Sequence, residues 1–455
     1  MTAKKEIKDF TKGNITRQLF VFALPLFLSN LLQVVYNMVD MVVVGNVMGK
    51  TGLSAVSVGG DVSAFMMFIS IGFSSAGQVI IAQYIGKKQT DKIGKFVATM
   101  SSFLFLCAVA ISAFCIIFRE DILRLMNTPD EAFAGALAYS TICAVGLVFI
   151  YGYNAVSAIL RGMGDSTHPF VFIAIAAFLN VILDVLFVYF LDMGAGGAAL
   201  ATVISQALSF IVSVIYLMRH RSAFCLDVTL RDFLQPKKEM LVALLKLGVP
   251  MAIKMASVQF SKLFVNSFIN GYGVAVSAFA GIANKVASIS NLISNSLNTA
   301  GSSMVGQNIA ACEYKRVTQI VVRLFAITLI IATLLSLAVA FFPNQIFGLF
   351  LRAGEEDALA IGLEYIPIAV LIFFGSACRA PMNALINGSG NIRLNFVTAI
   401  LDGIVLRIGL SALFGIYCQM EYMGFWLGDA LAGFTPFVIG VLFYISGVWR
   451  KKQIA

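Results

Sequence analysis

Residues 96–118, FVATMSSFLFLCAVAISAFCIIF, form an apolar run that contains no charged residue. A helix that crosses the hydrocarbon core of a bilayer needs about 20 mostly apolar residues, so this run is long enough to cross a membrane once. Similar runs follow one another along the chain, separated by charge clusters and by Gly or Pro breaks. The sequence therefore predicts an all-α polytopic membrane protein with twelve transmembrane helices. The expected spans are 17–44, 51–84, 92–118, 134–160, 167–191, 195–219, 241–270, 275–308, 316–350, 358–385, 392–417 and 422–449.

The composition excludes most other classes of protein. Of the 455 residues, 59% are hydrophobic and 12% are charged, whereas a soluble protein averages about 45–50% apolar and about 25% charged residues. This excludes a soluble enzyme, a disordered chain and a disulfide-stapled secreted domain. The net charge of +9 is spread between apolar blocks without a continuous basic face, so no nucleic-acid partner is expected. Seven cysteines without a CxxC spacing and two histidines predict neither a redox motif nor a zinc site.

The positive charges predict the orientation in the membrane. Most of the 32 Lys and Arg residues fall in the two termini and in every second loop, and the opposite loops hold only Lys50, Arg119, Arg124 and Arg352. Because cytoplasmic loops carry an excess of Lys and Arg, both termini are predicted to be cytoplasmic and the chain to be a multi-pass protein of the inner (plasma) membrane. The residues predicted to be cytoplasmic include Lys4, Lys5, Lys87, Lys88, Arg161, those of the segment Arg219–Lys246, Arg379, Lys451 and Lys452.

An internal repeat divides the chain. Pro25 and Pro250 lie about 225 residues apart, and three further pairs follow in the same order at nearly the same separation: Gln83 with Gln307, Gly164 with Gly390, and Gly197 with Gly424. Four pairs in order predict a duplicated six-helix bundle, and an even helix number gives both copies the same orientation. The predicted domains are an N-terminal lobe (1–219), a cytoplasmic linker (220–240) and a C-terminal lobe (241–455). Two parallel lobes are typical of transporters.

Polar residues within the predicted spans of the first half are candidates for function. Steps of four, three and four residues place Ser29, Gln33, Tyr36 and Asp40 on one face of the first helix, next to Asn37. Asn180 and Asp184 share a face of the fifth helix for the same reason. Such acids bind Na⁺ through oxygen or carry a proton; the alternative is that hydrogen bonds satisfy them and they only join helices.

The second half carries positive charge instead. Lys254, Lys262 and Lys285 fall within predicted spans, together with Asp402 and Arg407. They attract anionic or zwitterionic groups, or else Asp402 pairs with a lysine and the other side chains reach the membrane surface. The eighth helix adds an amide face that lines a cavity or packs between helices: Asn284, Ser288, Asn291, Asn295 and Asn298.

Six stretches of the first half form a characteristic series: ALPLFLSNLLQVVYNMVDMVVVG (23–45), GLSAVSVGGD (52–61), AQYIGKK (82–88), LRGMGDSTHP (160–169), FLNVILDVLF (178–187) and AGGAALATVISQ (195–206). In this order they resemble the multidrug and toxic compound extrusion (MATE) family, and its DinF-like branch in particular, and the resemblance extends over essentially the whole chain. The resemblance implies two six-helix bundles and export of organic compounds against H⁺ or Na⁺.

The resemblance also implies residue roles. It assigns a cation site, for H⁺ or for Na⁺, to Asp40, Tyr139, Asn180, Asp184 and Thr202. It places bending of the first helix at Pro25 and adds further polar residues to the substrate cavity. The whole expected cavity set is Gln33, Tyr36, Asn37, Asn154, Lys254, Lys262, Lys285 and Asn291.

The sequence thus predicts a secondary antiporter rather than an enzyme, monomeric, without a cofactor beyond its coupling ion, and with small organic molecules and lipid as partners. Its natural substrate and the choice between H⁺ and Na⁺ stay open. The main alternative is a flippase for a lipid-linked or anionic substrate, which the interior lysines favour. A major-facilitator transporter, a channel and a membrane-embedded enzyme are weaker alternatives, since the loop after residue 86 has the wrong spacing for the first and no motif supports the others.

Overall fold

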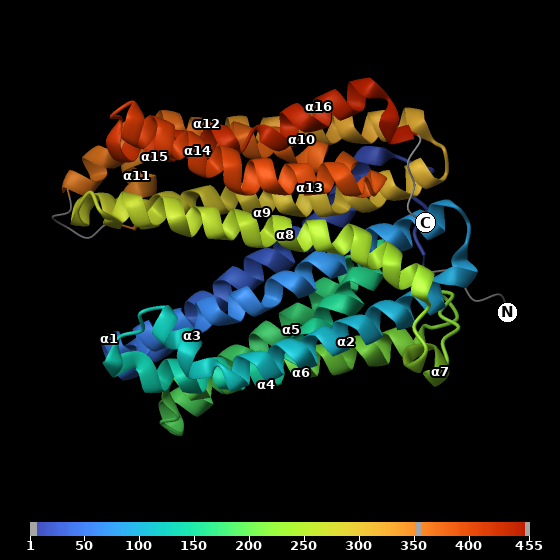
Figure 1. Ribbon diagram of the computed structural model, residues 1–455, viewed down its shortest axis with the longest axis horizontal. Coiled ribbons are helices and arrows are strands. Elements are labelled where there is room, and N and C mark those ends of the chain that lie inside the picture. Colours follow the sequence, from blue (N-terminus) through green and yellow to red (C-terminus); the bar gives the residue numbers. More distant parts are fainter. Residues whose placement is uncertain (1–6, 351–355, 451–455) are drawn as a thin grey trace. The chain divides into compact units, whose positions relative to one another are not determined.

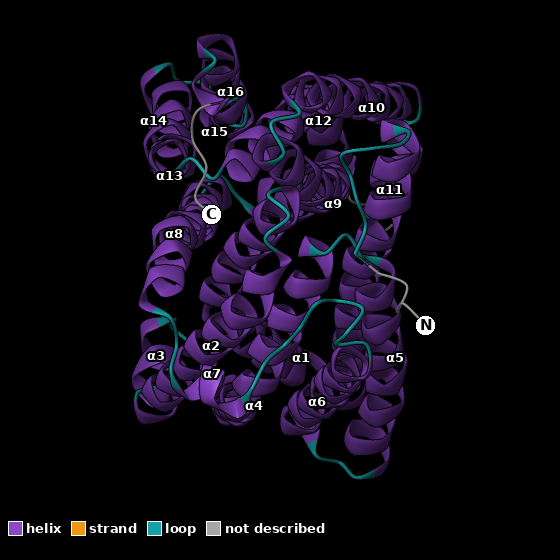
Figure 2. Cartoon of the chain, turned by 90° about the vertical axis from the view of Figure 1, so that its right-hand side faces the viewer, coloured by secondary structure: helices purple, strands orange, loops and turns teal. Residues whose placement is uncertain are grey.

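The computed structural model describes residues 7–350 and 356–450, and within those ranges it contains helices and loops but no strand (Figures 1 and 2). Several predicted charges lie outside the described residues: Lys4, Lys5, Arg352, Lys451 and Lys452. The α-helices of the first half are α1 (Ile15–Gly86), α2 (Ile93–Ile117), α3 (Arg119–Leu125), α4 (Asp130–Gly162), α5 (Thr167–Asp184), α6 (Gly194–Arg219) and α7 (Leu230–Leu234). Those of the second half are α8 (Lys238–Asn270), α9 (Val274–Ala310), α10 (Tyr314–Phe341), α11 (Pro343–Gly348), α12 (Glu356–Ser389), α13 (Ile392–Ile400), α14 (Leu406–Ala412), α15 (Glu421–Ala432) and α16 (Thr435–Ser446).

Short segments of other helical types complete the chain. Single 3₁₀ turns are η1 (Thr90–Lys92) and η5 (Val448–Arg450). Wider π-helical turns are η2 (Val185–Phe190), η3 (Leu401–Val405) and η4 (Leu413–Tyr417). The π turns extend α5 in the first half and both ends of α14 in the second, so the helices that they interrupt remain long enough to span a bilayer.

The prediction of twelve crossings is confirmed. Eleven helical segments of the described chain are long and apolar enough to cross a membrane, and the first of them, α1, is 72 residues long. Its Gly49 has φ 63° and ψ −147°, which is not helical and which glycine adopts without steric cost. The break at Gly49 divides α1 into the two crossings expected at 17–44 and 51–84.

The chain forms two compact units. One contains residues 1–9 and 24–252, and the other contains 10–23 and 253–455. The division therefore falls inside α1, between Ala23 and Leu24, and inside α8, between Ala252 and Ile253. The lobe boundaries predicted from the sequence remain a prediction beside this division.

Each unit is a bundle of closely packed helices. In the first unit, α4 packs along α6 and α2, and α5 also packs on α6; in the second, α12 packs along α9 and α10 (Figure 1). Glycines allow the close approach in the first unit. A Cβ at Gly146 would lie 2.4 Å from Val203, and one at Gly152 would lie 2.5 Å from Phe210. The helices come together at these points because neither glycine has a side chain.

The internal repeat is visible at the level of single contacts. The missing side chain of Gly162 faces the Gln78 carbonyl and Ile81, and that of Gly388 faces the Ser302 carbonyl and Val305. Gly162 and Gly388 are separated by the same spacing as Gly164 and Gly390, both of which have positive φ, and their partners are separated by the same spacing as Gln83 and Gln307. A second repeated contact, Gly197 against Phe187, recurs as Gly424 against Phe414. The repeat predicted from the sequence is therefore confirmed in the packing.

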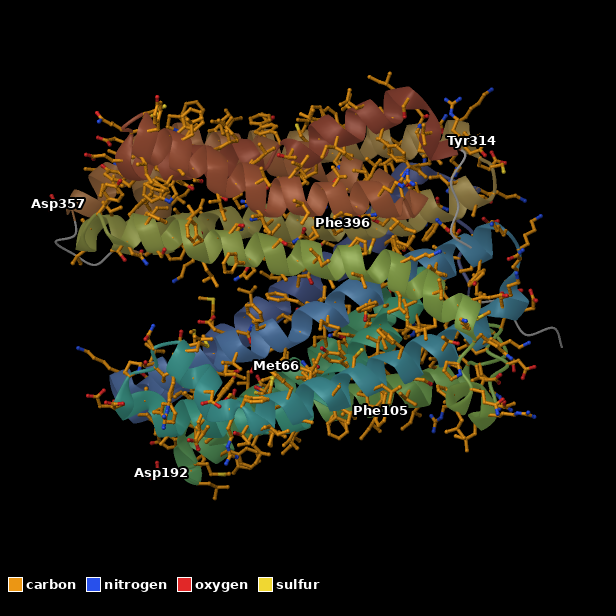
Figure 3. All side chains as sticks on the ribbon, in the orientation of Figure 1. Met66, Phe105, Asp192, Tyr314, Asp357 and Phe396 are labelled. Carbon is orange, nitrogen blue, oxygen red and sulfur yellow. The ribbon has the colours of Figure 1, made fainter. Side chains whose placement is uncertain are left out.

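The outer faces of the helices are apolar. Phe105 on α2 is 53% exposed and Phe396 on α13 is 46% exposed, and both project from the ribbon in Figure 3. Many other large apolar side chains are equally exposed. A bilayer accommodates such faces, whereas a soluble protein rarely exposes them in continuous areas.

Two arginines lie inside helices rather than in the loops to which the topology argument assigned them. Arg161 is in the last turn of α4, where its Nε donates to Gln78 Oε1 at 3.0 Å. Arg379 lies within α12 and is half-buried. The predicted span 358–385 already includes Arg379, six residues before its end, so this arginine belongs with the interior charges of the second half rather than with the loop that follows.

The segment predicted as a linker is ordered by a cap. Thr229 precedes α7, and its hydroxyl and backbone N–H donate to Asp232 Oδ2 at 2.6 and 2.9 Å. These hydrogen bonds hold the pKa of Asp232 below its ordinary value. Ser102 of α2 donates to the Phe233 carbonyl at 2.7 Å, which fixes α7 against α2.

Candidate functional site

The first unit contains a pair of buried acids. Asp40 of α1 and Asp184 of α5 are 3% and 0% exposed, and their carboxyl groups are close enough to interact directly. Within the described part of the chain, both oxygens of Asp184 and Oδ1 of Asp40 have no hydrogen-bond partner. A buried carboxylate without a partner is costly, so the pair needs a proton or a cation between its oxygens.

Three neighbours predicted for this site are brought to it. Asn180 lies one turn before Asp184 on α5, and its Nδ2 is 3.4 Å from the hydroxyl of Thr202 on α6. Thr202 also lies beside Asp40, and Tyr139 of α4 is within electrostatic range of both acids. The Oδ1 atom of Asn180 is a further buried oxygen with no partner among the residues described. The five side chains of the predicted cation site therefore gather in one place, and their roles remain predictions.

The local fold explains why Asp184 is buried. It is the last residue of α5, and the π turn η2 begins directly after it. A π turn widens the helix and changes the direction of the side chains that follow, which is why such turns are frequent at functional sites. At this point the polar face of α5 is directed toward α6, on which it packs.

The predicted cavity residues of α1 and α4 differ in their relation to the acid pair. Tyr36 lies near Asp40 and contacts Gln206 of α6. Asn154 donates to Ser70 Oγ at 3.2 Å and belongs to the α1–α4 contact. Gln33 is half-buried and Asn37 is exposed, and the hydrogen bonds of the described residues connect neither of them to the acid pair.

Sequence reasoning missed two neighbours of the acid pair. Gln206 follows Thr202 by one helical turn on α6, and this spacing is a usable signal. Cys143, one turn after Tyr139 on α4, lies near Asp40 and Tyr139. It is buried among these groups, but an isolated cysteine within an apolar run gives no sequence signal for that position.

Pro25 lies in α1 close to the division between the units. It is two residues after Ala23, where the helix leaves the second unit. Proline removes one backbone hydrogen bond from a helix, and here the hydroxyl of Ser29 donates to the Pro25 carbonyl at 2.8 Å. The preceding segment is held in the second unit, where Phe10 N donates to Gln307 Oε1 at 2.9 Å and Arg316 Nε donates to the Phe10 carbonyl at 2.8 Å.

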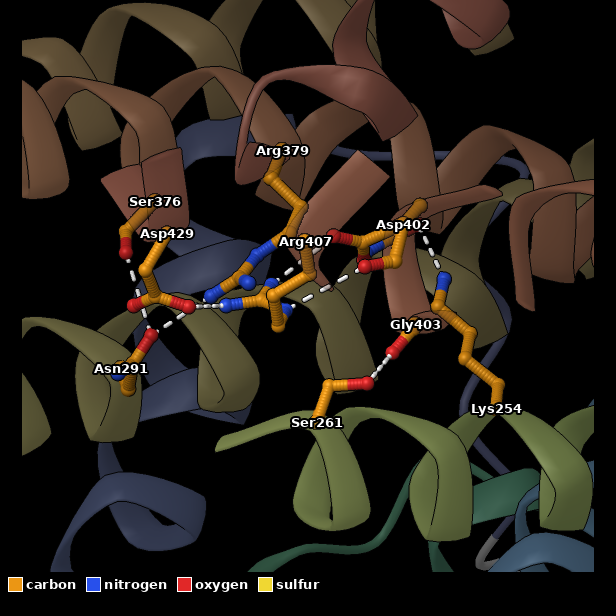
Figure 4. A network of polar contacts seen from close by, with 10 residues as sticks. Lys254, Ser261, Asn291, Ser376, Arg379, Asp402, Gly403, Arg407 and Asp429 are labelled. Atoms are coloured by element: carbon orange, nitrogen blue, oxygen red, sulfur yellow. Dashed lines mark hydrogen bonds and ion pairs between the residues drawn. The ribbon is translucent and has the colours of Figure 1, made fainter. Parts of the chain in front are cut away.

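The second unit has a different polar centre, built around Arg407 of α14 (Figure 4). Its guanidinium forms an ion pair with Asp402 Oδ1 at 3.0 Å and a second with Asp429 Oδ1. The guanidinium Nε also donates to the Asp402 carbonyl at 3.3 Å. The sequence interpretation that Asp402 pairs with a lysine is thus wrong: Arg407, five residues later across the π turn η3, is its partner.

The other cations of this centre bond to amides. Lys254 Nζ donates to Asn383 Oδ1 at 2.7 Å, and Arg379 donates to Asn291 Oδ1 at 2.6 Å. Asn291 Oδ1 also accepts from Ser376 at 3.2 Å (Figure 4). The amide face of α9 is thereby used in part as a set of acceptors for buried positive charge.

A cavity of about 50 Å³ lies beside this network, within the second unit. Charged, amide and aromatic side chains share its wall, and Arg379 and Asp429 were not predicted for it. Its polar lining comprises Lys262, Asn266, Asn284, Asn291, Tyr365, Ser376, Arg379, Arg407 and Asp429, with Trp426 among its aromatic residues. Lys285 does not line this cavity; it is exposed, with its Nζ 5.4 Å from the ring centre of Phe350, and its role in the substrate cavity stays a prediction.

Across the described ranges, no group of three or more His, Cys, Asp or Glu side chains is arranged to hold a metal ion. The donor set around Asp40 instead combines two carboxylates with amide and hydroxyl oxygens. These are the hard oxygen donors that alkali cations prefer, and the same atoms carry a proton equally well.

Comparisons with known proteins identify the family. The MatE family model matches residues 25–186 and 250–413, that is, once in each half. The chain is 33% identical to the probable multidrug resistance protein YoeA of Bacillus subtilis, over 98% of this chain and 96% of that protein. It is 23% identical to the multidrug export protein MepA of Staphylococcus saprophyticus, over 91% and 90%.

Solved structures share the fold. A MOP superfamily transporter from Pyrococcus furiosus, described as having a binding pocket of reverse polarity, matches with a TM-score of 0.90 and 21% identity over 99% of this chain and all of that one. The outward-facing form of a multidrug resistance MATE transporter matches with a TM-score of 0.91 and 21% identity over the same shares. With a family model matched in both halves, the chain belongs to the MATE family of multi-pass membrane transporters.

Proposed function

We propose that the protein exports organic compounds across the cell membrane in exchange for H⁺ or Na⁺, which binds between Asp40 and Asp184. The observation that carries this proposal is the acid pair itself. Its two carboxyl groups are buried side by side, and three of their oxygens have no hydrogen-bond partner in the described chain. An acid pair that only joined helices would have these oxygens satisfied.

The exchange follows from linkage. A cation or proton neutralises the pair, so its binding changes the contacts of Asp40 with Thr202 on α6 and with Asp184 on α5. Because Asp40 lies on α1, the change is transmitted to the helix that also carries Tyr36 and Pro25. Ion and substrate then exchange if each weakens the binding of the other. The organic substrate is a proposal drawn from the multidrug relatives.

Orientation and partners belong to the same proposal. The excess of Lys and Arg in alternate loops favours cytoplasmic termini, and the proposed partners are lipid and the organic substrate. We propose a monomer without a cofactor other than the coupling ion.

The test uses purified protein in liposomes with a fluorescent organic cation as the reporter. A pH gradient and a Na⁺ gradient are imposed separately on wild type and on Asp40→Asn. The exposed Asp192→Asn is the matched control, because it makes the same substitution in the same unit away from the acid pair. We expect one gradient to drive reporter movement in wild type and the control, and Asp40→Asn to abolish it.

Either of two results would contradict the proposal. Gradient-driven transport that persists in Asp40→Asn would exclude the acid pair as the coupling site. A folded wild-type protein that responds to neither gradient would exclude H⁺ or Na⁺ exchange with an organic cation. The second result would favour the alternative of a flippase or an anion transporter, for which the positive charge of the second unit is the supporting observation.

A further inference from the structure

The polar centre of the second unit has more positive than negative charge. Its cations are Lys254, Lys262, Arg379 and Arg407, and its carboxylates are Asp402 and Asp429. All six interact electrostatically with others of the set. Charges enclosed in a helix bundle are stable only when they are compensated, so the two additional cations require an explanation.

The two carboxylates are already used. Arg407 forms ion pairs with both Asp402 and Asp429, and among the described residues of this unit these are the only salt bridges. Lys254 and Arg379 donate to the amide oxygens of Asn383 and Asn291, which carry no charge. Amide acceptors satisfy hydrogen bonds, but they leave the positive charge uncompensated.

Two of these cations face the cavity. Lys262 and Arg379 both line it, on α8 and α12 respectively, and in the described chain neither forms a salt bridge. Arginine keeps its proton under all ordinary conditions, and its planar fork matches the two oxygens of a carboxylate or a phosphate. A lysine on the opposite helix adds a second donor to the same space.

The size of the cavity limits what it holds. Its volume is about 50 Å³, compared with about 10–15 Å³ for one ordered water and about 300 Å³ or more for a drug-sized pocket, so the space suits one compact polar group rather than a whole drug. Exposed Asn284 lies on its wall, so the cavity reaches the surface of the unit. Tyr365 and Asn266 supply neutral polar atoms beside the two cations.

The geometry points to a binding site in the second unit for a single carboxylate or phosphate group of a substrate, held by Lys262 and Arg379. Asp429 also lines the cavity, and because Arg407 balances only one of its two carboxylate partners, Lys262 and Arg379 share in balancing Asp429. The four cations still exceed the two carboxylates, and this excess of positive charge is what an anionic group would compensate. The inference rests on the proposed export function, and it refines the substrate class to compounds that carry a compact anionic group.

Trp426 provides a direct reporter for this site. It lines the cavity, and the chain has only one other tryptophan, Trp449 of η5. In a Trp449→Phe background, the emission of purified full-length protein therefore reports on the cavity wall. The probes are inorganic phosphate and acetate, with choline chloride at the same ionic strength as the comparison. If this background is poorly folded, the difference between wild type and Trp426→Phe gives the same signal.

The key variants change one charge. Lys262→Met removes a cavity cation with little change in length, and Lys262→Arg retains the charge. Lys246→Met is the matched control, because it makes the same substitution at an exposed position of the same helix, outside the cavity. We expect phosphate or acetate to change Trp426 emission saturably, Lys262→Met to weaken this binding about tenfold, and Lys262→Arg and Lys246→Met to retain it.

The source of the anionic group is resolved by a second arm. Protein in nanodiscs of phosphatidylcholine is compared with protein in nanodiscs that also contain phosphatidylglycerol. If the lipid headgroup occupies the site, phosphatidylglycerol alone changes the emission and blocks the response to phosphate; if the group belongs to a soluble substrate, the phosphate response is the same in both. Both outcomes support an anion site.

The proposal is overturned if folded protein gives no saturable response in either lipid, or if Lys262→Met binds the probe as tightly as the background. No gradient is needed in this assay, so its failure is distinct from that of the exchange proposal. Loss of gradient-driven transport with intact phosphate binding would contradict the proposed function alone.

Discussion

The polar centres of the two units are built from opposite charges on a shared framework. In the first unit, Asp40 and Asp184 are buried together, and three of their oxygens have no hydrogen-bond partner within the described residues. In the second, both carboxylates are paired with Arg407, and the additional charges are positive. The carboxyl oxygens of the first centre need a proton or a cation to bind them. In the second centre Arg407 pairs with both carboxylates, and the cations outnumber the carboxylates.

Residues related by the repeat show how this difference arose. At the spacing that relates Pro25 to Pro250, Asp40 corresponds to Val265; at the spacing that relates Gly197 to Gly424, Thr202 corresponds to Asp429. Tyr139 and Tyr365, related by the spacing of Gly164 and Gly390, are tyrosines in both units. The scaffold was kept while the charged positions were not, so the two units offer different chemistry. Removing a charge should accordingly have opposite effects on stability in the two centres.

The largest effect is expected from Arg407→Met. The substitution leaves Asp402 and Asp429 buried without their partner, and breaking such a pair from one side typically costs about 3–5 kcal/mol. The measurement is the free energy of unfolding in mixed detergent micelles. Arg407→Lys is the matched control: it keeps the charge but reaches only one carboxylate well, so its loss should be smaller. Equal stability of wild type and Arg407→Met would show that the second centre is not held by its ion pairs.

A smaller effect is expected where the repeated glycine contact differs between the units. The nearest atom to a Cβ at Gly424 is the backbone carbon of Phe414 at 2.4 Å, whereas at Gly197 it is the Met193 side chain at 2.9 Å. Backbone atoms give way less readily than side chains, so Gly424→Ala should destabilise by about 1–3 kcal/mol and Gly197→Ala by less. The two variants are controls for each other in the same unfolding experiment. The reverse order would mean that the first unit, not the second, is the more tightly packed copy.

The sequence predicts the polar centre of the first unit better than that of the second. The twelve crossings and the repeat could be read from apolar runs and from glycine and proline spacing, because both are local patterns. The first centre could also be found, since Asp40, Asn180 and Asp184 lie on helical faces at regular steps. The second could not be assembled: Arg379 lies inside the predicted span 358–385 but was counted with the loop that follows it, and Asp402 meets Arg407 only because a π turn alters the helical register between them.

A change of opposite sign is expected from Asp184→Asn. The side chain keeps its size, and in the described structure its carboxyl oxygens have no hydrogen bond to lose. Removal of a buried, uncompensated charge should therefore raise the free energy of unfolding by about 1 kcal/mol, while gradient-driven transport is lost. The unfolding and liposome assays are made on the same preparation, with Asp192→Asn as the control in both. A destabilised Asp184→Asn would indicate that the acid is held by an interaction of its charged form, and the two centres would then be alike.

The smallest effect is expected from Lys285→Met, which tests whether positive charge matters in the second unit wherever it lies. Lys285 is exposed, and its described contact is with the ring of Phe350, an interaction that contributes about 0.5–1 kcal/mol at exposed sites. Its loss should lower the free energy of unfolding by no more than that amount, in contrast to Arg407→Met in the same unit. A loss comparable to that of Arg407→Met would mean that Lys285 is part of the buried charge network. The second centre would then have to be defined by its total charge rather than by the ion pairs of Arg407 and the cavity beside them.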